Sequence, residues 1–458
     1  MTEPTRALAE FAADFRAADI PPAVRDQAKI AIADAMGTVL AGINEESVRH
    51  VRDWALRETR PGRASVLGTG SKLAATGAAL ANGAAAHALD YDNISLTVSG
   101  FIASPVLFAA LAVAEEEGVV PGEKLLDAFI IGWESEAAIA RGLGVHHYAK
   151  GWHSTATLGH FGAAIGTARL LGLNAVQMQS VIGTAASEAS GMRTMIGNML
   201  NPFHVGKAAR NGITAARLVQ QGFLAHESVL ETAWGFCEVF NGAGNFDLAA
   251  ISNGLGSRFD LTDPGLVVKV HPCCGLIHSS LDAVLDLIDV HDFDWRAVTH
   301  VRVSVHELVP KTMRFDDPRS GYEAKFSTPF CIASALHEGS VSLAHFTDER
   351  TRDGDIRGLM SRVEMVVHPD LHGYDTFLEK EFSEVAISLA DGRTLTKRIQ
   401  RISNKGSRGR PVSMDDIAAK FADCARDYPD RPAADAALAK LRILDQIGDI
   451  REITACLC

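Results

Sequence analysis

The sequence predicts a mainly α-helical protein, with a large all-helical domain and an inserted smaller α+β domain. Three features indicate this fold: helical spacing of apolar residues through about the first 260 residues, short β-branched runs after them, and helical signals again near the C-terminus. The predicted domains are residues 1–265 (helical), residues 266–400 (α+β) and residues 401–458, which return to the helical domain. A chain of 458 residues that is 47% hydrophobic is long enough for more than one core.

The first domain is expected to be a crowded bundle of helices. Residues 22–41 place apolar side chains three and four positions apart and end before Gly42. Residues 73–89 are nearly all Ala, Gly and Leu, a composition that indicates close approach between helices. Further helices are predicted at residues 105–117, 122–141, 154–171 and 175–191.

Near Leu266 the sequence pattern changes from helical spacing to short β-branched runs. Strands are predicted at residues 266–270, 301–305, 363–367, 385–389 and 394–396, and the last two flank the hairpin signal Asp391-Gly392. Helices are predicted between them at residues 277–290 and 328–338. Ser413, with Asp416 three positions later, is expected to cap the first returning helix.

Composition excludes several classes of partner. The formal charge is −12 and no basic block occurs, which argues against nucleic acid. No apolar run reaches the roughly 20 residues of a membrane-spanning helix, and the N-terminus lacks the apolar region of a secretory signal. Seven cysteines in so long a chain do not form a disulfide framework, so we expect reduced thiols and a cytoplasmic protein without a membrane partner.

Several common catalytic signatures are missing from the sequence. It contains no G-x-x-x-x-G-K-[ST], no H-E-x-x-H and no G-x-S-x-G. The sequence therefore gives no support for a phosphate-binding loop, a zinc protease or a serine hydrolase.

The densest group of reactive side chains lies at residues 269–278, where Lys269, His271, Cys273, Cys274 and His278 share ten positions. Adjacent cysteines rarely bind one tetrahedral ion together, and no C-x-x-C spacing is present, which disfavours a metal site. A thiolate nucleophile would need a general base, and His278 is the candidate. Core thiols at a buried strand end and an acid/base role of His278 beside Lys269 are the two other interpretations.

Three further polar segments are candidate site elements. Residues 87–93 end an apolar helix with paired acids, which form either a solvated cap or a carboxylate facing a cleft. Within residues 148–155, His153 is expected at a helix N-terminus, where an anion binds well and the helix dipole lowers the imidazole pKa; a structural cap is the alternative. Residues 201–212 place Lys207 and Arg210 on nearly one helix face, which is either functional or a solvated basic surface.

These four segments, in this order, resemble the MmgE/PrpD family, which includes 2-methylcitrate dehydratase, cis-aconitate decarboxylase and iminodisuccinate epimerase. The likeness covers almost the whole chain and rests on residues 88–92, 153–159, 204–209, 272–278 and 324–329. The resemblance implies a helical domain, an α+β lid, an active site between them and a homodimer. It implies no metal and no organic cofactor.

The sequence departs from the family pattern at three places. The family's D-[FY]-D-D-T is Asp90-Tyr91-Asp92-Asn93-Ile94 here, the usual H-P-S falls at residues 101–103, and a lysine is replaced by Asn201. A hydroxyl, an imidazole and an amine that dehydratase and decarboxylase members rely on are thus absent. Asp90, His153 and His278 remain at matching positions.

The remaining groups favour proton transfer next to a carboxylate. Expelling hydroxide needs an acid and a base together, whereas moving a proton needs two groups flanking one carbon and cations over the substrate carboxylates. We expect His153 and His278 to be that pair, with Tyr148 or Lys207 able to replace one of them and Asp90 in the catalytic set. The expected substrate-binding residues are Lys207, Lys269, Arg193, Asn93, Asn201 and His204.

The favoured function is therefore a cofactor-independent epimerase or isomerase of a small di- or tricarboxylate, similar to iminodisuccinate epimerase. One alternative is a lyase similar to 2-methylcitrate dehydratase or cis-aconitate decarboxylase. The other is a non-catalytic family member that binds a carboxylate.

Overall fold

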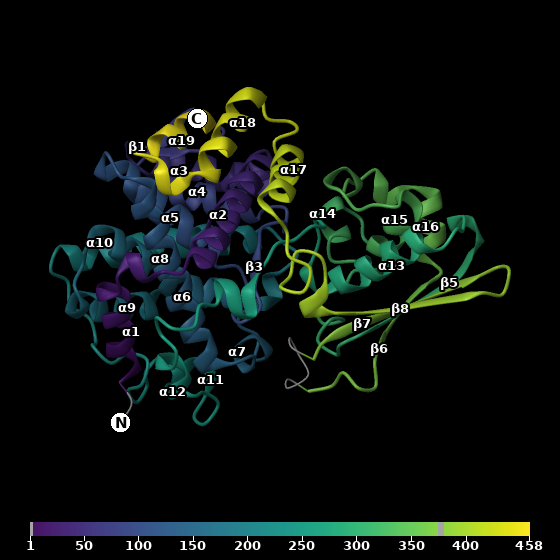
Figure 1. Ribbon diagram of the computed structural model, residues 1–458, viewed down its shortest axis with the longest axis horizontal. Coiled ribbons are helices and arrows are strands. Elements are labelled where there is room, and N and C mark those ends of the chain that lie inside the picture. Colours follow the sequence, from purple (N-terminus) through teal and green to yellow (C-terminus); the bar gives the residue numbers. More distant parts are fainter. Residues whose placement is uncertain (1–2, 374–379) are drawn as a thin grey trace. The chain divides into compact units, whose positions relative to one another are not determined.

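The computed structural model describes residues 3–373 and 380–458 (Figure 1). It is 57% helical with 10% strand, so the predicted mainly α-helical fold is confirmed. The chain divides into two compact units. Unit 1 contains residues up to Ala88, Asp92–Val267 and Ser413–Cys458, and unit 2 contains Leu89–Tyr91 and Val268–Val412.

Unit 1 is built from helices, and the C-terminal helices pack with the N-terminal ones (Figure 1). Its main helices are α1 (Pro4–Asp14), α2 (Pro22–Gly42), α3 (Glu46–Glu58), α4 (Ala75–His87), α5 (Ala103–Glu117), α6 (Gly122–Leu143), α7 (His146–Ala149), α8 (Ser154–Leu171), α9 (Ala175–Glu188), α10 (Leu200–Gln220), α11 (Phe236–Asn241), α12 (Leu248–Ser252), α17 (Met414–Cys424), α18 (Arg431–Arg442) and α19 (Arg451–Thr454). Two short pairs of strands join them: β1 (Pro61–Val66) with β2 (Ser71–Leu73), and β3 (Ile94–Ser95) with β4 (Leu266–Val267).

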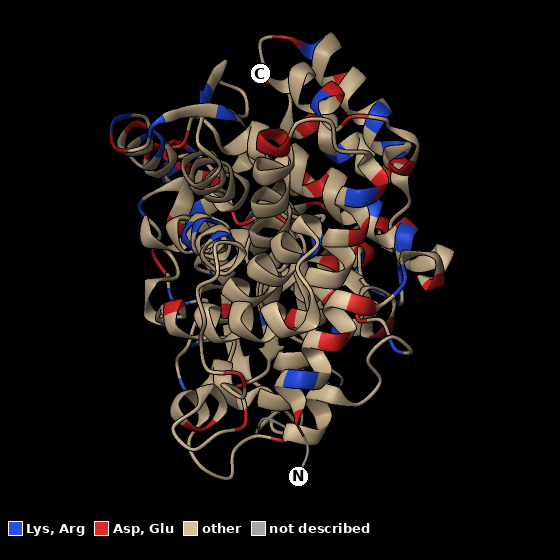
Figure 2. Ribbon diagram, turned by 90° about the vertical axis from the view of Figure 1, so that its left-hand side faces the viewer, with Lys and Arg blue, Asp and Glu red and all other residues tan. Residues whose placement is uncertain are grey.

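The centre of unit 1 is formed by α4, α8 and α10, which pack closely on one another. Charged residues are sparse on the central helices and frequent on the outer ones (Figure 2). A Cβ atom added to Gly206 of α10 would lie 2.1 Å from the carbonyl oxygen of Leu80, and one added to Gly83 would lie 2.8 Å from the Cα atom of Gly206. The glycines therefore let the backbones of α4 and α10 touch, as the composition of residues 73–89 predicts.

We expect Gly206→Ala to lower the free energy of unfolding by about 1–3 kcal/mol, because the added methyl group forces two backbones apart. Gly448→Ala is the matched control, since a Cβ atom there meets nothing within 4 Å. Urea denaturation of both variants measures the difference. Equal midpoints for the two variants would contradict the close contact between α4 and α10.

Unit 2 contains a four-stranded sheet in the order β6-β5-β7-β8. Its strands are β5 (Val298–Val305), β6 (Val363–Val367), β7 (Phe382–Leu389) and β8 (Thr394–Gln400), and its helices are α13 (His278–Val290), α14 (Gly321–Ala324), α15 (Thr328–Glu338) and α16 (Gly354–Met360). Strands β5 and β6 are parallel and the other pairs are antiparallel. Alternate residues of β7 are buried, and α13 packs on β7 and β8, so the helices cover one face of the sheet (Figure 1).

The hairpin at Asp391-Gly392 is confirmed, with Gly392 at a φ of 87°. The strand predicted at residues 266–270 is wrong in its extent. Only Leu266–Val267 is a strand, and it pairs with β3 in unit 1. The strand does not continue past Val267, because the backbone amide of Val268 donates instead to the carbonyl oxygen of Gly406 in unit 2.

Ser413 caps α17 through a capping box with Asp416, as predicted. No helix in the described part of the chain is both long enough and apolar enough to cross a membrane.

Candidate active site

A pair of buried imidazoles forms the centre of the polar cluster in unit 1. His153 is the N-cap residue of α8, and His204 lies in α10 with its Nδ1 atom 3.0 Å from Nδ1 of His153. One nitrogen must donate a proton and the other must accept it, so at least one ring is neutral. Burial lowers the pKa of His153 well below its usual value, as do the charges of His204, His87 and Lys207. Burial, followed by the charge of Lys207, also lowers the pKa of His204 to about 4. Both rings are therefore neutral near pH 7.

Lys207 lies three positions after His204 on α10. Its Nζ atom donates to the carbonyl oxygen of Ser190 at 2.6 Å and to the hydroxyl of Ser190 at 2.7 Å. Burial, together with the charge of Arg210, lowers its pKa to about 8. Lys207 thus supplies a cation that exchanges its proton close to neutral pH.

Tyr148 and Arg193 form a second pair in unit 1. Tyr148 lies in α7, the Arg193 guanidinium lies 4.5 Å from the centre of its ring, and Arg193 also donates to the Tyr148 carbonyl oxygen at 3.1 Å. The backbone amide of Arg193 donates to the carbonyl oxygen of Gly151 at 2.8 Å, which holds the Arg193 segment against the loop after α7. This stacking orients the phenol ring and the guanidinium relative to one another.

The two predicted asparagines occupy different environments. Asn93 is buried, and its amide group donates to the carbonyl oxygen of Ala31 at 3.1 Å and to Asp34 at 3.0 Å. Asp34 in turn pairs with Lys420 at 2.6 Å. These contacts join α2 to the loop after α4 and engage the amide nitrogen of Asn93; its role in substrate binding stays a prediction. Asn201 is buried at the second position of α10.

Sequence reasoning did not select His87, which lies beside this cluster. His87 ends α4, and its Nδ1 atom lies 2.8 Å from Asp92, whose second carboxylate oxygen accepts a bond from Ser104 at 2.9 Å. The centre of its ring is 6.5 Å from the ring of His153 and 4.2 Å from the ring of Phe101. The sequence signal that could have identified it is a histidine followed five positions later by an aspartate, after the end of α4.

The second polar cluster lies in unit 2 and contains Asp90 and Lys269. Their carboxylate and ammonium groups are 2.9 Å apart, and Lys269 also donates to the Asp90 carbonyl oxygen at 2.8 Å. The two side chains are 5% and 2% exposed. Lys269 was predicted to clamp a substrate carboxylate, but its first partner is the protein's own Asp90.

His278 is the first residue of α13. Its Nε2 atom lies 3.3 Å from the Cys273 carbonyl oxygen, and its ring is nearly perpendicular to that of His271, with centres 5.1 Å apart. His271 is bound to Asp282 at 2.9 Å. Lys325, which sequence reasoning did not select as a site residue, donates to the Pro272 carbonyl oxygen at 2.7 Å. These bonds fix the segment that leads to His278.

The two thiols of this segment do not have the environment of a nucleophile. Cys273 and Cys274 are buried. Burial raises the pKa of Cys274 to about 12, and it raises that of Cys273 well above the usual value. Both therefore stay protonated, whereas a nucleophile or a metal ligand must be a thiolate. Within residues 3–373 and 380–458, no three His, Cys, Asp or Glu side chains are grouped so as to hold a metal ion.

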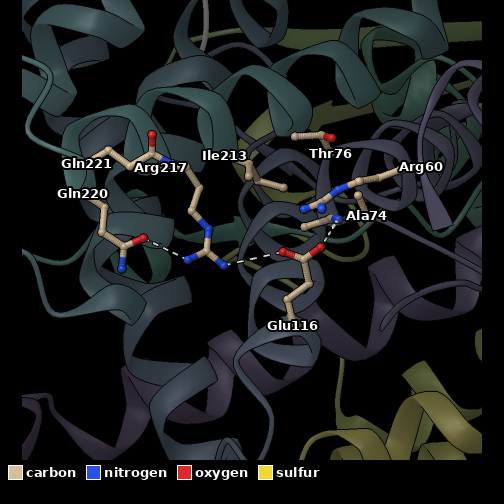
Figure 3. A pocket seen from close by; sticks show the side chains of 9 residues that line it. Arg60, Ala74, Thr76, Glu116, Ile213, Arg217, Gln220 and Gln221 are labelled. Carbon is tan, nitrogen blue, oxygen red and sulfur yellow. Dashed lines mark hydrogen bonds and ion pairs between the residues drawn. The ribbon is translucent and has the colours of Figure 1, made fainter. Parts of the chain in front are cut away.

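A separate hollow of about 430 Å³ lies in unit 1 at the start of α4 (Figure 3). Glu116 accepts the Ala75 amide at 2.7 Å and faces Arg217 at 3.6 Å, and Arg217 also donates to Gln220 at 2.9 Å. The charges of Glu116 and Arg217 are thus paired with one another. The hollow contains none of the predicted site residues.

Comparison with known protein families covers nearly all of the chain. The MmgE/PrpD N-terminal domain matches residues 6–249, and the MmgE/PrpD C-terminal domain matches residues 271–446. The chain belongs to the MmgE/PrpD family.

Similar members of the family include cis-aconitate decarboxylases from fungi and mammals. The chain is 31% identical to cis-aconitate decarboxylase of Aspergillus terreus over 422 residues, which cover 87% of this chain and 84% of that protein. It is 23% identical to the Mus musculus cis-aconitate decarboxylase, over 93% of this chain and 88% of that protein. The Homo sapiens cis-aconitate decarboxylase is 24% identical, over 84% of this chain and 80% of that protein.

Proposed function

We propose that the chain is a cofactor-independent enzyme that forms and protonates a carbanion next to a carboxylate of a small di- or tricarboxylate. The observation that carries this proposal is one cluster in unit 1 that combines two buried neutral imidazoles with a cation whose pKa is about 8. Neutral imidazoles accept or relay protons, and the cation stabilises negative charge that develops on a substrate.

The first candidate reaction is decarboxylation, since the relatives described above are cis-aconitate decarboxylases. The sequence motifs favoured an epimerase and gave the decarboxylase as an alternative, so the ranking is now reversed. In decarboxylation the C–C bond breaks, carbon dioxide leaves, and the electron pair spreads onto the remaining unsaturated carboxylate until one donor protonates it. One acid is enough for this step, whereas dehydration needs an acid and a base at once. The replacements at Ile94, Phe101 and Asn201 therefore weaken the case for a dehydratase more than that for a decarboxylase.

The second candidate is epimerisation, and the neutral state of His153 and His204 favours it. A neutral imidazole can remove a proton from the carbon next to a carboxylate, and a second group returns a proton on the other face. Both candidates pass through a similar carbanion, so the same cluster serves either reaction.

One panel of assays separates the candidates. The purified protein is incubated in D₂O with cis-aconitate, 2-methylcitrate or iminodisuccinate stereoisomers, and carbon dioxide, alkene products and deuterium incorporation are followed by NMR. Release of carbon dioxide from cis-aconitate supports decarboxylation, and deuterium at an α-carbon without carbon loss supports epimerisation. If these carboxylates raise the melting temperature but none of them reacts, the result would favour a carboxylate-binding protein over an enzyme. The homodimer stays a prediction, which light scattering of the same preparation tests.

We expect Lys207→Arg to remove an alkaline limb from the pH profile of kcat/KM. The folded-state pKa of Lys207 is lowered from 10.5 to about 8, first by burial, so its charge is complete below pH 7 and is lost as the pH rises through 8. Arginine keeps its charge over this whole range. The profile is measured from pH 6 to 10, with Lys440→Arg as the control because Lys440 is a surface residue paired with Glu452. If the alkaline limb of the kcat/KM profile is the same in Lys207→Arg as in wild type, Lys207 is not the group that titrates in the reaction.

A further inference from the structure

The second ring nitrogen of His87 has no partner in the described part of unit 1. The side chain is fully buried, and its Nδ1 atom is held by Asp92 at 2.8 Å, but its Nε2 atom makes no hydrogen bond. A buried nitrogen that has given up water without gaining a partner costs stability. Such a group in a folded protein calls for an explanation, and a catalytic role in which a ligand completes its hydrogen bonding is one.

Asp92 determines which form of His87 is present. Its two carboxylate oxygens accept from His87 Nδ1 and from the Ser104 hydroxyl, at 2.8 and 2.9 Å. With Asp92 ionised, the ring proton lies on Nδ1 and the lone pair lies on Nε2. The carboxylate also stabilises the imidazolium that forms when Nε2 takes up a proton. This His87–Asp92 pair is thus prepared to accept a proton and return it.

The surroundings of His87 connect it to the histidine cluster of unit 1. Its ring lies 6.5 Å from that of His153, and a positive charge on it lowers the pKa of both His153 and His204. The titratable groups that face it are therefore Asp92, His153 and His204. Phe101 lies against the ring with centres 4.2 Å apart, which provides an apolar wall on that side.

We infer that His87 is a catalytic acid/base residue whose Nε2 atom contacts the reacting part of the carboxylate substrate, an inference that rests on the proposed function. In epimerisation, Nε2 takes a proton from the carbon next to the carboxylate while the electron pair of the C–H bond stays on the substrate. In decarboxylation, protonated His87 gives its Nε2 proton to the carbanion left after carbon dioxide departs, and it regains a proton from water. Asp92 and Ser104 act as positioning residues through the Nδ1 side of the ring.

A purely structural role makes a different prediction. A tie between the end of α4 and Asp92 needs only the Nδ1 side of the ring. Asparagine at position 87 can donate its amide proton to Asp92 as Nδ1 does, yet it has no basic nitrogen at the Nε2 position. His87→Asn therefore separates the two roles.

The matched control is His147→Asn. His147 is also a buried histidine of unit 1, but both of its ring nitrogens have partners, Asn241 at 3.0 Å and Thr157 at 2.7 Å. We expect His87→Asn to lower kcat by about 100-fold or more, with KM changed less than about threefold, and to lose one limb of the pH profile. His147→Asn is expected to lower the melting temperature while keeping kcat and the pH profile. A His87→Asn variant with normal kcat and an unchanged profile would overturn the inference while leaving the proposed function in place.

A second measurement keeps the test independent of turnover. Protein labelled with ¹⁵N-histidine is titrated with cis-aconitate, citrate or succinate, and the His87 resonances are assigned by their absence in His87→Asn. A shift of the His87 Nε2 signal on binding supports the contact, even if the wild-type protein converts none of the substrates and the proposed reaction fails. Carboxylate binding that shifts His153 but not His87 overturns the inference alone. No binding and no turnover with any of these compounds overturn both.

Discussion

His278→Ala is expected to lower turnover by about 100- to 10,000-fold, the range typical of a lost acid/base group, while unit 2 keeps its fold. The residue is 1% exposed, and the contact of its ring with the Cys273 carbonyl oxygen is long at 3.3 Å. Neighbouring bonds from His271 to Asp282 and from Lys325 to Pro272 still hold the segment when the imidazole is gone. Removing the ring should therefore cost far more activity than stability.

Two further variants test whether the loss of turnover comes from the acid/base function of His278. His278→Gln keeps a side-chain donor for the Cys273 carbonyl oxygen but removes the acid/base function, so it should be as inactive as His278→Ala and nearer to wild type in melting temperature. His300→Ala removes an exposed histidine of β5 and should change neither property. Steady-state kinetics with the carboxylate that reacts in the assay panel, together with thermal unfolding, measure both. Near-normal activity of His278→Ala would exclude it from the catalytic set.

The parts of the site that the sequence predicted are those with local signals. The position of His153 at the start of α8 follows from a histidine before Ser154 and Thr155 and an apolar helical pattern, and the structure has it there. The close approach of α4 to α10 follows similarly from the small residues around Gly83.

The parts that the sequence did not predict depend on contacts between distant segments. The contact of His153 with His204 joins residues 51 positions apart, and that of Lys269 with Asp90 joins residues 179 positions apart. No periodic pattern encodes such pairs, because they depend on how the helices and loops pack. Asn93 shows the same limit: it is adjacent to the site motif in sequence, but its amide bonds Asp34 of α2.

Asp90→Asn is expected to destabilise unit 2 by about 3–5 kcal/mol, because it removes the carboxylate charge that pairs with the buried Lys269 ammonium. Asp90 has a φ of 51°, a conformation that asparagine also tolerates, so the substitution changes the charge and not the backbone preference. The Asp90 carbonyl oxygen, 2.8 Å from the Lys269 ammonium, remains available but carries no full charge. The loss is therefore electrostatic, and it should appear as a large drop in the melting temperature of the full chain.

The double variant Asp90→Asn/Lys269→Met distinguishes this cause from a general disturbance of the fold. Removing the second charge as well should restore much of the lost stability, since a buried pair replaced by neutral side chains costs far less than a single unpaired charge. Asp294→Asn, which breaks an exposed pair with Arg296, should stay within about 0.5 kcal/mol of wild type. Neither the double variant nor Asp90→Asn should be active if the pair holds Asp90 in place for catalysis. An active, stable double variant would show that the Asp90–Lys269 pair is only a structural link between residues 89–91 and the rest of unit 2.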